Sequence, residues 1–352
     1  MARRVRGLIV AVAVVAAIAT AAGYAFRDLR FSYVSSELRV ALETAQTLVA
    51  ALVTHLLYGR FRRTHLLRDL LLAYGMGLFA VANLFFVTAP VVGPPAPGPE
   101  YETWTPLLNR LFAAVAIAWA AWIPDRRYHA PRAGTRLLGA HVLTVAVIVA
   151  GVTLLAGRLP DGVEASLLTS ESTAPVIEGH PVLLGAQILL TGLYWLAAAG
   201  FARLAPQGGA LTTAFAAGFV LAGFARLNFF LYPSVYTTVV QTGDVLRLSC
   251  YLALLVGAER ELHGYWAGLA QAAVAEQRRR TARELHDGVI QDLSLIRSRT
   301  SSRPGGKLDG ATLAQVAQAA ERALAESRRA IQALSGKEGP AQDEGRPVTG
   351  WE

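Results

Sequence analysis

The sequence predicts an all-α protein, made of a polytopic membrane helix bundle with eight spans followed by a cytoplasmic helical hairpin that forms a dimeric four-helix bundle. Hydrophobic residues make up 53% of the 352 residues, and the mean hydropathy of +0.39 lies far from that of soluble proteins. Apolar stretches of a length that crosses a ~30 Å hydrocarbon core recur along the chain. From residue 259 onward the composition becomes charged, alanine-rich and favourable for helix formation.

Eight apolar stretches are predicted to cross the membrane. They cover residues 7–26, 38–58, 70–89, 107–123, 137–156, 182–201, 214–231 and 239–258. The first follows three arginines, as a secretion signal does, but its apolar run is longer than a signal core and seven further spans follow. We therefore expect a retained helix.

The arginines predict the orientation of these spans. Alternate connections, beginning with the N-terminus, hold twelve Arg or Lys residues, whereas the opposite connections hold three. Positive charge stays on the cytoplasmic side, so we expect a multi-pass protein of the cell membrane with both termini cytoplasmic. The net charge of +8 is then explained by loops that flank membrane lipid, and no direct nucleic-acid partner is expected.

Residue types that build metal or disulfide sites are scarce. Cys250 is the single cysteine and falls inside the eighth predicted span, which excludes an intrachain disulfide and a cysteine-based zinc site. No metal and no cofactor bound by the chain itself are expected. The outer connections 90–106 and 157–181 are too short for a domain with its own core, so any sensing is expected within the membrane bundle.

After the eighth span the sequence predicts two long helices. No proline occurs between residues 234 and 303, so the eighth span can continue into the cytoplasm as one rod, ending at the Pro-Gly-Gly breaker of residues 304–306. A second helix is expected over residues 311–334. Its apolar positions, with one serine among them, follow a near-heptad pattern: Leu313, Val316, Ala320, Leu324, Ser327, Ile331 and Leu334. Ala282, Leu285, Val289, Leu293 and Ile296 form a comparable stripe on the first helix.

These two stripes predict self-association. One hairpin cannot bury both of them, whereas two hairpins together form a four-helix bundle. We therefore expect a homodimer. The predicted organisation is an eight-span membrane region at 1–258, a helix at 259–275 that continues the last span, a dimerisation hairpin at 276–335, and a disordered tail at 336–352.

The first of these helices carries a chemically suggestive run, Arg-Glu-Leu-His-Asp-Gly-Val-Ile-Gln at residues 283–291. Phosphorylation of a histidine needs an exposed imidazole with a neighbouring carboxylate that orients the ring and raises its basicity. Asp287 is placed for that role beside His286. Gln291 lies one helical turn beyond Asp287, so the two side chains share a face.

This run resembles the phosphoacceptor motif of sensor histidine kinases of two-component systems, in the subgroup that reads R-E-L-H-D-x-x-x-Q. The resemblance covers about residues 276–334. It implies that His286 is the phosphoacceptor, that Asp287 assists phosphotransfer from ATP, and that Gln291 positions the water that hydrolyses the aspartyl phosphate of a response regulator. It further implies a response regulator partner, expected to bind DNA.

The chain departs from this family after the hairpin. Members carry a further ATP-binding domain, on the order of 100 residues long, and only 66 residues follow His286. We therefore expect no autokinase activity, and expect ATP to act only through the ATPase domain of a partner kinase supplied in trans. Phosphotransfer or phosphatase activity through the hairpin remains the enzymatic expectation.

A layer of polar residues is predicted in the outer half of the membrane. It comprises Glu43, Asn83, Arg110, Arg226 and Asp244, with Asn109, Asn228 and Arg247 nearby. Arg226 and Asp244 lie at matched depth and are expected to pair. Because charges inside a membrane are costly and usually face a cavity or one another, this layer is a candidate signal-binding site. Structural bonding between helices is the alternative.

The function predicted from the sequence is that of a membrane-bound sensor of a two-component phosphorelay. Two other functions stay open. A dimerising decoy or input protein without catalysis would be indifferent to replacement of His286 or Gln291, and a membrane transporter with a helical tail would be distinguished by transport into vesicles.

Overall fold

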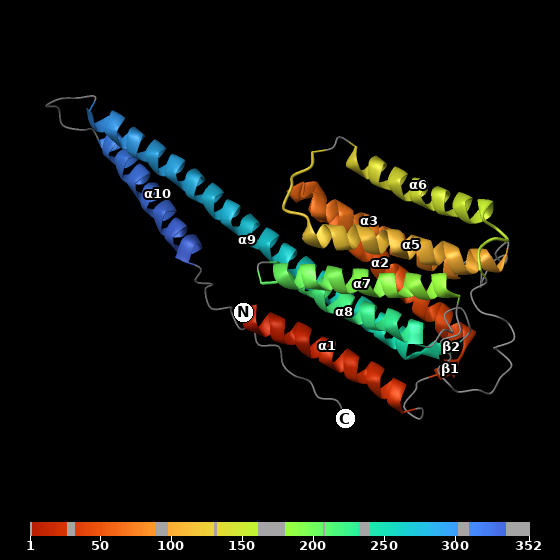
Figure 1. The fold of residues 1–352 in the computed structure, drawn as a ribbon. Coiled ribbons are helices and arrows are strands. Elements are labelled where there is room, and N and C mark those ends of the chain that lie inside the picture. Colours follow the sequence, from red (N-terminus) through yellow and green to blue (C-terminus); the bar gives the residue numbers. More distant parts are fainter. Residues whose placement is uncertain are drawn as a thin grey trace, which may run out of the picture. The chain divides into compact units, whose positions relative to one another are not determined.

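The computed structural model describes residues 2–26, 32–88, 98–129, 132–160, 180–206, 208–231, 239–301 and 310–335. It is built of helices, apart from one pair of three-residue strands (Figure 1). The chain divides into two compact units, Met1–His263 and Gly264–Glu352. The long helix α9 (Thr242–Ser301) contributes to both units.

The first unit is a bundle of apolar helices. In chain order its other elements are α1 (Ala2–Ala25), β1 (Ser32–Val34), α2 (Ser36–Thr64), α3 (Leu67–Val81), the π-helix η2 (Ala82–Thr88), α5 (Pro99–Trp122), α6 (Ala133–Leu154), α7 (Pro181–Leu204), α8 (Ala210–Leu231) and β2 (Val239–Gln241). The strands β1 and β2 pair antiparallel, with Tyr33 opposite Val240.

Seven helices of the described residues are long and apolar enough to cross a membrane, which identifies a multi-pass membrane protein. Their apolar ranges are Arg3–Ala25, Glu37–Thr64, Leu67–Phe85, Glu100–Trp122, Ala133–Leu154, Pro181–Leu204 and Ala210–Leu231. These correspond to the first seven predicted spans. The eighth predicted span, 239–258, forms β2 and the start of α9. It stands apart from the seven because the first 18 residues of α9 include the ionisable residues Asp244, Arg247 and Glu259.

Helices α5 and α3 show features that the predicted spans do not contain. Helix α5 begins at Pro99 rather than at residue 107. Proline suits the first position of a helix, and Glu100 and Glu102 in the first turn favour its positive end. Helix α3 changes at Ala82 into the π-helix η2, a geometry that is rare and often found at functional sites.

Close packing of small and aromatic residues joins α7, α8 and the start of α9. Phe201, Phe215 and Phe219 form a stack between α7 and α8, with Phe201 and Phe215 ring centroids 5.2 Å apart. A Cβ atom at Gly257 of α9 would clash with the Cβ of Ala214 in α8. Small residues that allow helices to approach closely are characteristic of contacts inside membranes, so the start of α9 is an integral part of the bundle.

The second unit contains the distal part of α9 and helix α10 (Gly310–Ser335). The proline-free stretch is helical as predicted, and α10 matches the helix expected over residues 311–334 within one residue at each end. Ala319 and Ala323 are buried on α10. The predicted breaker and the predicted disordered tail fall on residues 302–309 and 336–352, which lie outside the described residues.

Candidate functional site

The predicted phosphoacceptor residues lie on a solvated face of α9. His286, Asp287 and Gln291 are all exposed, and Asp287 and Gln291 are separated by one helical turn. Just before this segment, Glu276 accepts a hydrogen bond of 3.2 Å from Arg283. Such exposed contacts contribute little stability. Because His286, Asp287 and Gln291 are exposed, an approaching protein domain can reach their side chains.

The two helices of the second unit leave apolar side chains exposed. Leu313 and Leu324 lie eleven residues apart, about three turns, and so share one face of α10. They are 54% and 55% exposed, and Leu293 of α9 is 54% exposed. Val289 and Val316 are half-buried. The side chains of Leu285 and Ile331 lie outside the described residues. A single hairpin thus buries alanines of α10 and leaves leucines of the predicted seam in solvent.

All five residues of the predicted polar layer are buried in the bundle. Glu43 of α2, Asn83 of η2, Arg110 of α5, Arg226 of α8 and Asp244 of α9 each expose 8% or less of their surface. Five different elements therefore contribute one polar side chain each. The layer is a property of the folded bundle, because no single helix contains it.

Arg247 of α9 joins two of these residues. Its Nη2 lies 2.5 Å from the Glu43 carboxylate and 3.0 Å from the Asp244 carboxylate. Asp244 also accepts a hydrogen bond of 3.0 Å from the backbone N–H of Gln241 in β2. The sequence predicted that Asp244 pairs with Arg226, but the structure gives it a different cation. Asp244 and Arg247 lie three residues apart on α9, so their side chains are neighbours on one helix face whatever the position of α8.

Arg226 contacts neutral groups in the same layer. Its guanidinium donates a hydrogen bond of 3.5 Å to Gln187 of α7 and lies 5.4 Å from the Phe229 ring centroid. Asn228, two residues after Arg226 in α8, donates a 2.8 Å hydrogen bond to Thr20 of α1. The polar layer therefore also ties α1 to the bundle.

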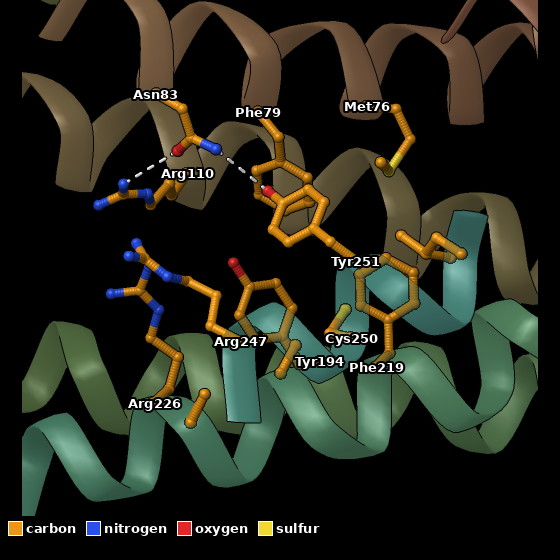
Figure 2. A pocket seen from close by; sticks show the side chains of 13 residues that line it. Met76, Phe79, Asn83, Arg110, Tyr194, Phe219, Arg226, Arg247, Cys250 and Tyr251 are labelled. Atoms are coloured by element: carbon orange, nitrogen blue, oxygen red, sulfur yellow. Dashed lines mark hydrogen bonds between the residues drawn. The ribbon is translucent and has the colours of Figure 1, made fainter. Parts of the chain in front are cut away.

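A cavity of about 30 Å³ opens within this layer. Figure 2 shows the guanidinium groups of Arg110, Arg226 and Arg247 gathered at one end of it. Asn83 holds two of its neighbours, since its Oδ1 accepts a 3.1 Å hydrogen bond from Arg110 and its Nδ2 donates a 3.3 Å hydrogen bond to Tyr251 (Figure 2). The π-helix η2 places Asn83, with Thr88 donating a hydrogen bond to the Asn83 carbonyl.

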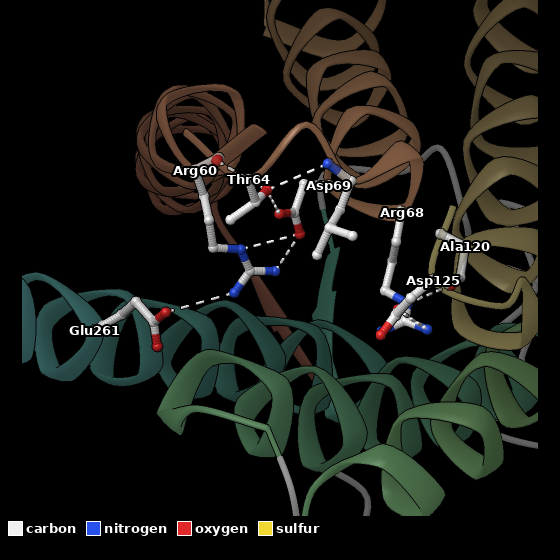
Figure 3. Close-up of polar contacts among 8 residues, drawn as sticks. Arg60, Thr64, Arg68, Asp69, Ala120, Asp125 and Glu261 are labelled. Atoms are coloured by element: carbon white, nitrogen blue, oxygen red, sulfur yellow. Dashed lines mark hydrogen bonds and ion pairs between the residues drawn. The ribbon is translucent and has the colours of Figure 1, made fainter. Parts of the chain in front are cut away.

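A second polar cluster lies where α2 ends and α3 begins (Figure 3). Arg60 donates to the buried carboxylate of Asp69 from Nε at 3.0 Å and from Nη2 at 2.5 Å. Thr64 donates a 3.0 Å hydrogen bond to the other oxygen of Asp69. On its far side Arg60 reaches Glu261 of α9 at 3.5 Å. This cluster, the Arg60 junction, connects the α2–α3 turn to α9 shortly before the second unit.

Sequence reasoning did not identify several of these residues. Tyr194 and Tyr251 line the cavity, and Gln187 binds Arg226, although each reads as an ordinary residue of an apolar span. In the sequence, Arg60 contributes only to the positive charge that predicts the orientation of the spans, and its pairing with Asp69 was not predicted. Glu261, shortly after the end of a predicted span, could have indicated an ion pair at the membrane surface. Its partner, Arg60 of α2, is 201 positions away in the sequence.

These observations define a class: a multi-span membrane protein with a C-terminal helical region whose long helix presents an exposed histidine motif. Comparison with known families then identifies that region. Residues 277–339 match the family model HisKA_3, described as histidine kinase. The segment is a histidine kinase dimerisation and phosphoacceptor domain, and such a domain implies dimerisation and a response regulator partner. Searches of curated proteins and of solved structures return no match to this chain.

The Arg60 junction makes a testable prediction about stability. Asp69→Ala removes a carboxylate that is 1% exposed and leaves Arg60 and Thr64 without it, so we expect a loss of about 2 kcal/mol, discounted for the partly exposed Arg60. Thermal unfolding in one detergent measures it. Asp125→Ala is the matched control, because Asp125 pairs with Arg68 at 2.9 Å but is 65% exposed, and a loss within ~1 kcal/mol is expected. Equal losses in the two variants would contradict a structural role of the junction.

Proposed function

We propose that this protein is a membrane sensor of a two-component phosphorelay in which His286 is the phosphoacceptor. The observation that carries the proposal is the match of residues 277–339 to a histidine kinase family, together with the exposure of His286 on α9. Asp287 orients the imidazole and takes part in proton transfer, and Gln291 positions the water that attacks a regulator's aspartyl phosphate. The helical spacing of Asp287 and Gln291 supports these roles.

The proposed hairpin acts as a dimer. Two copies bury the exposed leucines of the seam in a four-helix bundle, and each leucine buried contributes ~1.5 to 3 kcal/mol. Ala319 and Ala323, already buried within one chain, form the contact inside each hairpin. The leucines then form the contact between hairpins.

We further propose that the start of α9 is an eighth span and that both termini are cytoplasmic. Two ion pairs join α9 to α2, which is itself a candidate span. Arg247 meets Glu43, and Glu261 meets Arg60. The residue numbers of the partners increase together on both helices, from 43 to 60 on α2 and from 247 to 261 on α9. Helix α9 therefore runs parallel to α2 over the ~21 Å from Arg247 to Glu261. An even number of spans agrees with the arginine-rich alternate connections.

The proposed signal acts at the intramembrane polar layer. The layer has features expected of a sensory site, because three of its charged residues, Arg110, Arg226 and Arg247, come from three helices and line one cavity. A change there bears directly on Arg247, and Arg247 belongs to the helix that carries His286. Phosphoryl groups reach His286 from ATP through the ATPase domain of a kinase, and the response regulator that receives them binds DNA.

The phosphoacceptor assignment predicts labelling of His286. With radiolabelled ATP and the isolated ATPase domain of a kinase from the same family, the reconstituted chain should become labelled, whereas His286→Gln should not, because it lacks the nucleophilic nitrogen. Gln291→Ala should still accept label and should lose most of its ability to dephosphorylate a phosphorylated response regulator. His263→Gln is the control, since His263 is exposed on the same helix. Equal labelling of the unmodified chain and of His286→Gln would exclude the assignment. Indifference to this replacement is what the alternative of a decoy without catalysis predicts.

The dimer makes a separate prediction. Leu324→Asp places a charge in the seam, and we expect it to shift the full chain from dimer to monomer, since a buried unpaired charge costs several kcal/mol. Light scattering on the detergent-solubilised protein measures the mass. Gln318→Asp is the matched control, because Gln318 is exposed on the same helix away from Leu324. A monomer for the unmodified chain, or dissociation by both variants, would argue against this seam.

A further inference from the structure

The distribution of charge around the cavity identifies the kind of ligand that it suits. In the described part of the polar layer the cations are Arg110, Arg226 and Arg247, and Arg39 of α2 interacts electrostatically with the same carboxylates, Glu43 and Asp244. Both carboxylates form ion pairs with Arg247. The described part of the layer therefore has more positive than negative charge, in an apolar surrounding where such an excess is costly.

Arg110 illustrates the consequence. It is 4% exposed and lines the cavity, and its guanidinium donates to the neutral amide of Asn83. No carboxylate of the described residues lies within ion-pair distance of it. An anion in the cavity would meet Arg110 directly, together with the other two guanidinium groups in Figure 2.

Hydrogen-bond donors on the cavity wall agree with an anionic ligand. The Nε of Arg247 is buried and has no hydrogen-bond partner among the described residues. The Tyr251 oxygen accepts from Asn83, so its own O–H is available to donate. The hydroxyl of Tyr194 points toward the guanidinium groups (Figure 2). Arginines and tyrosines therefore present donors to one end of the cavity.

The other end of the cavity is apolar. Met76 and Phe219 lie at this end, away from the guanidinium groups (Figure 2), so a ligand that carries oxygens on every side would leave acceptors without donors there. The volume of about 30 Å³ is small, so the cavity suits a ligand of a few heavy atoms better than a nucleotide, a sugar or a lipid headgroup. A planar carboxylate with a short alkyl group satisfies both ends, because guanidinium groups bind carboxylates in bidentate geometry.

The geometry points to a binding site for a small organic carboxylate, of the size of acetate or propionate, held by Arg110, Arg226 and Arg247. The inference rests on the proposed function, because it names the ligand class of the proposed signal site. The carboxylate group lies among the guanidinium groups and Tyr251, and the alkyl group faces Met76 and Phe219. Binding adds the negative charge that the described layer lacks and alters the field at Arg247.

Binding is tested on the full chain in nanodiscs of neutral phosphatidylcholine. Sodium propionate and sodium acetate are titrated at constant ionic strength against sodium chloride and sodium phosphate, and the unfolding temperature is followed. A ligand that binds only the folded state raises this temperature in a saturable way. We expect saturation with the carboxylates and no saturable rise with chloride or phosphate. Equal responses to all four salts, or a response to phosphate alone, would overturn the inference.

Variants locate the site. Arg110→Gln should weaken propionate binding by roughly tenfold or more, the effect of one lost charge-assisted hydrogen bond. Arg203→Gln is the matched control, because Arg203 lies over the Trp122 ring at 4.7 Å, apart from the cavity residues, and it should bind as the unmodified chain does. Should Arg110→Gln fail to fold, Tyr251→Phe keeps the ring, removes the donor and is expected to bind more weakly. Unchanged affinity in the folded variants would overturn the assignment.

The outcome is separable from that of the proposed function. The titration uses no phosphotransfer, so propionate binding without any change in regulator dephosphorylation would keep the carboxylate site and remove its sensory role. Loss of the His286 assignment would leave the binding curve unchanged. Conversely, labelling of His286 without any carboxylate binding would refute the carboxylate site and leave the phosphoacceptor assignment intact.

Discussion

The ion triad of Arg247, Glu43 and Asp244 is the interaction on which the arrangement of the bundle depends. Charges inside an apolar bundle are stable only when they meet one another or a polar ligand. Arg247 and Asp244 belong to α9 and Glu43 belongs to α2. The ion pair between Arg247 and Glu43 therefore holds the start of α9 against α2. Breaking the triad would leave at least one charge buried without compensation, so the helix cannot move at this level without a cost.

The Arg60 junction repeats this contact near the C-terminal end of α2 and further along α9, with the charges reversed. At the triad α2 supplies the carboxylate and α9 the guanidinium, whereas at the junction α2 supplies Arg60 and α9 supplies Glu261. A rotation or sliding of α9 relative to α2 therefore disturbs both ion pairs together. Two such contacts on one pair of helices oppose a gradual displacement of α9, and the proposed sensor requires such resistance if it is to switch between discrete states.

Much of the fold could be predicted from the sequence because it follows from local patterns. Seven spans, the long proline-free helix and the helix after the breaker each depend on composition over one stretch of chain. The His286 motif is likewise local, and its residues keep their helical spacing in the structure. The π-helix at Asn83 and the early start of α5 at Pro99 were not predicted, because the alternatives differ by small energies that packing decides.

The partners of buried charges could not be predicted in the same way. Depth matching placed the five polar residues in one layer, and the structure brings Asn83, Arg110 and Arg226 to one cavity. Depth does not reveal which helices are neighbours, so the pairing of Asp244 with Arg226 was assigned where Arg247 takes that place. The link between Arg60 and Glu261 joins residues far apart in the sequence, which no local pattern encodes.

The central claim is that the state of the intramembrane layer reaches the phosphoacceptor hairpin through continuous α9. The most direct measurement is disulfide cross-linking of the full chain in nanodiscs, with Cys250→Ala and Leu293→Cys as the background, compared with Arg247→Gln added, Ala272→Pro added, or both. Proline inside a helix interrupts it, at ~3 kcal/mol or more. The account predicts that Arg247→Gln changes the cross-linking yield and that this change disappears when Ala272→Pro is present. An unchanged yield with Arg247→Gln alone, or a change that persists through the proline, would contradict it.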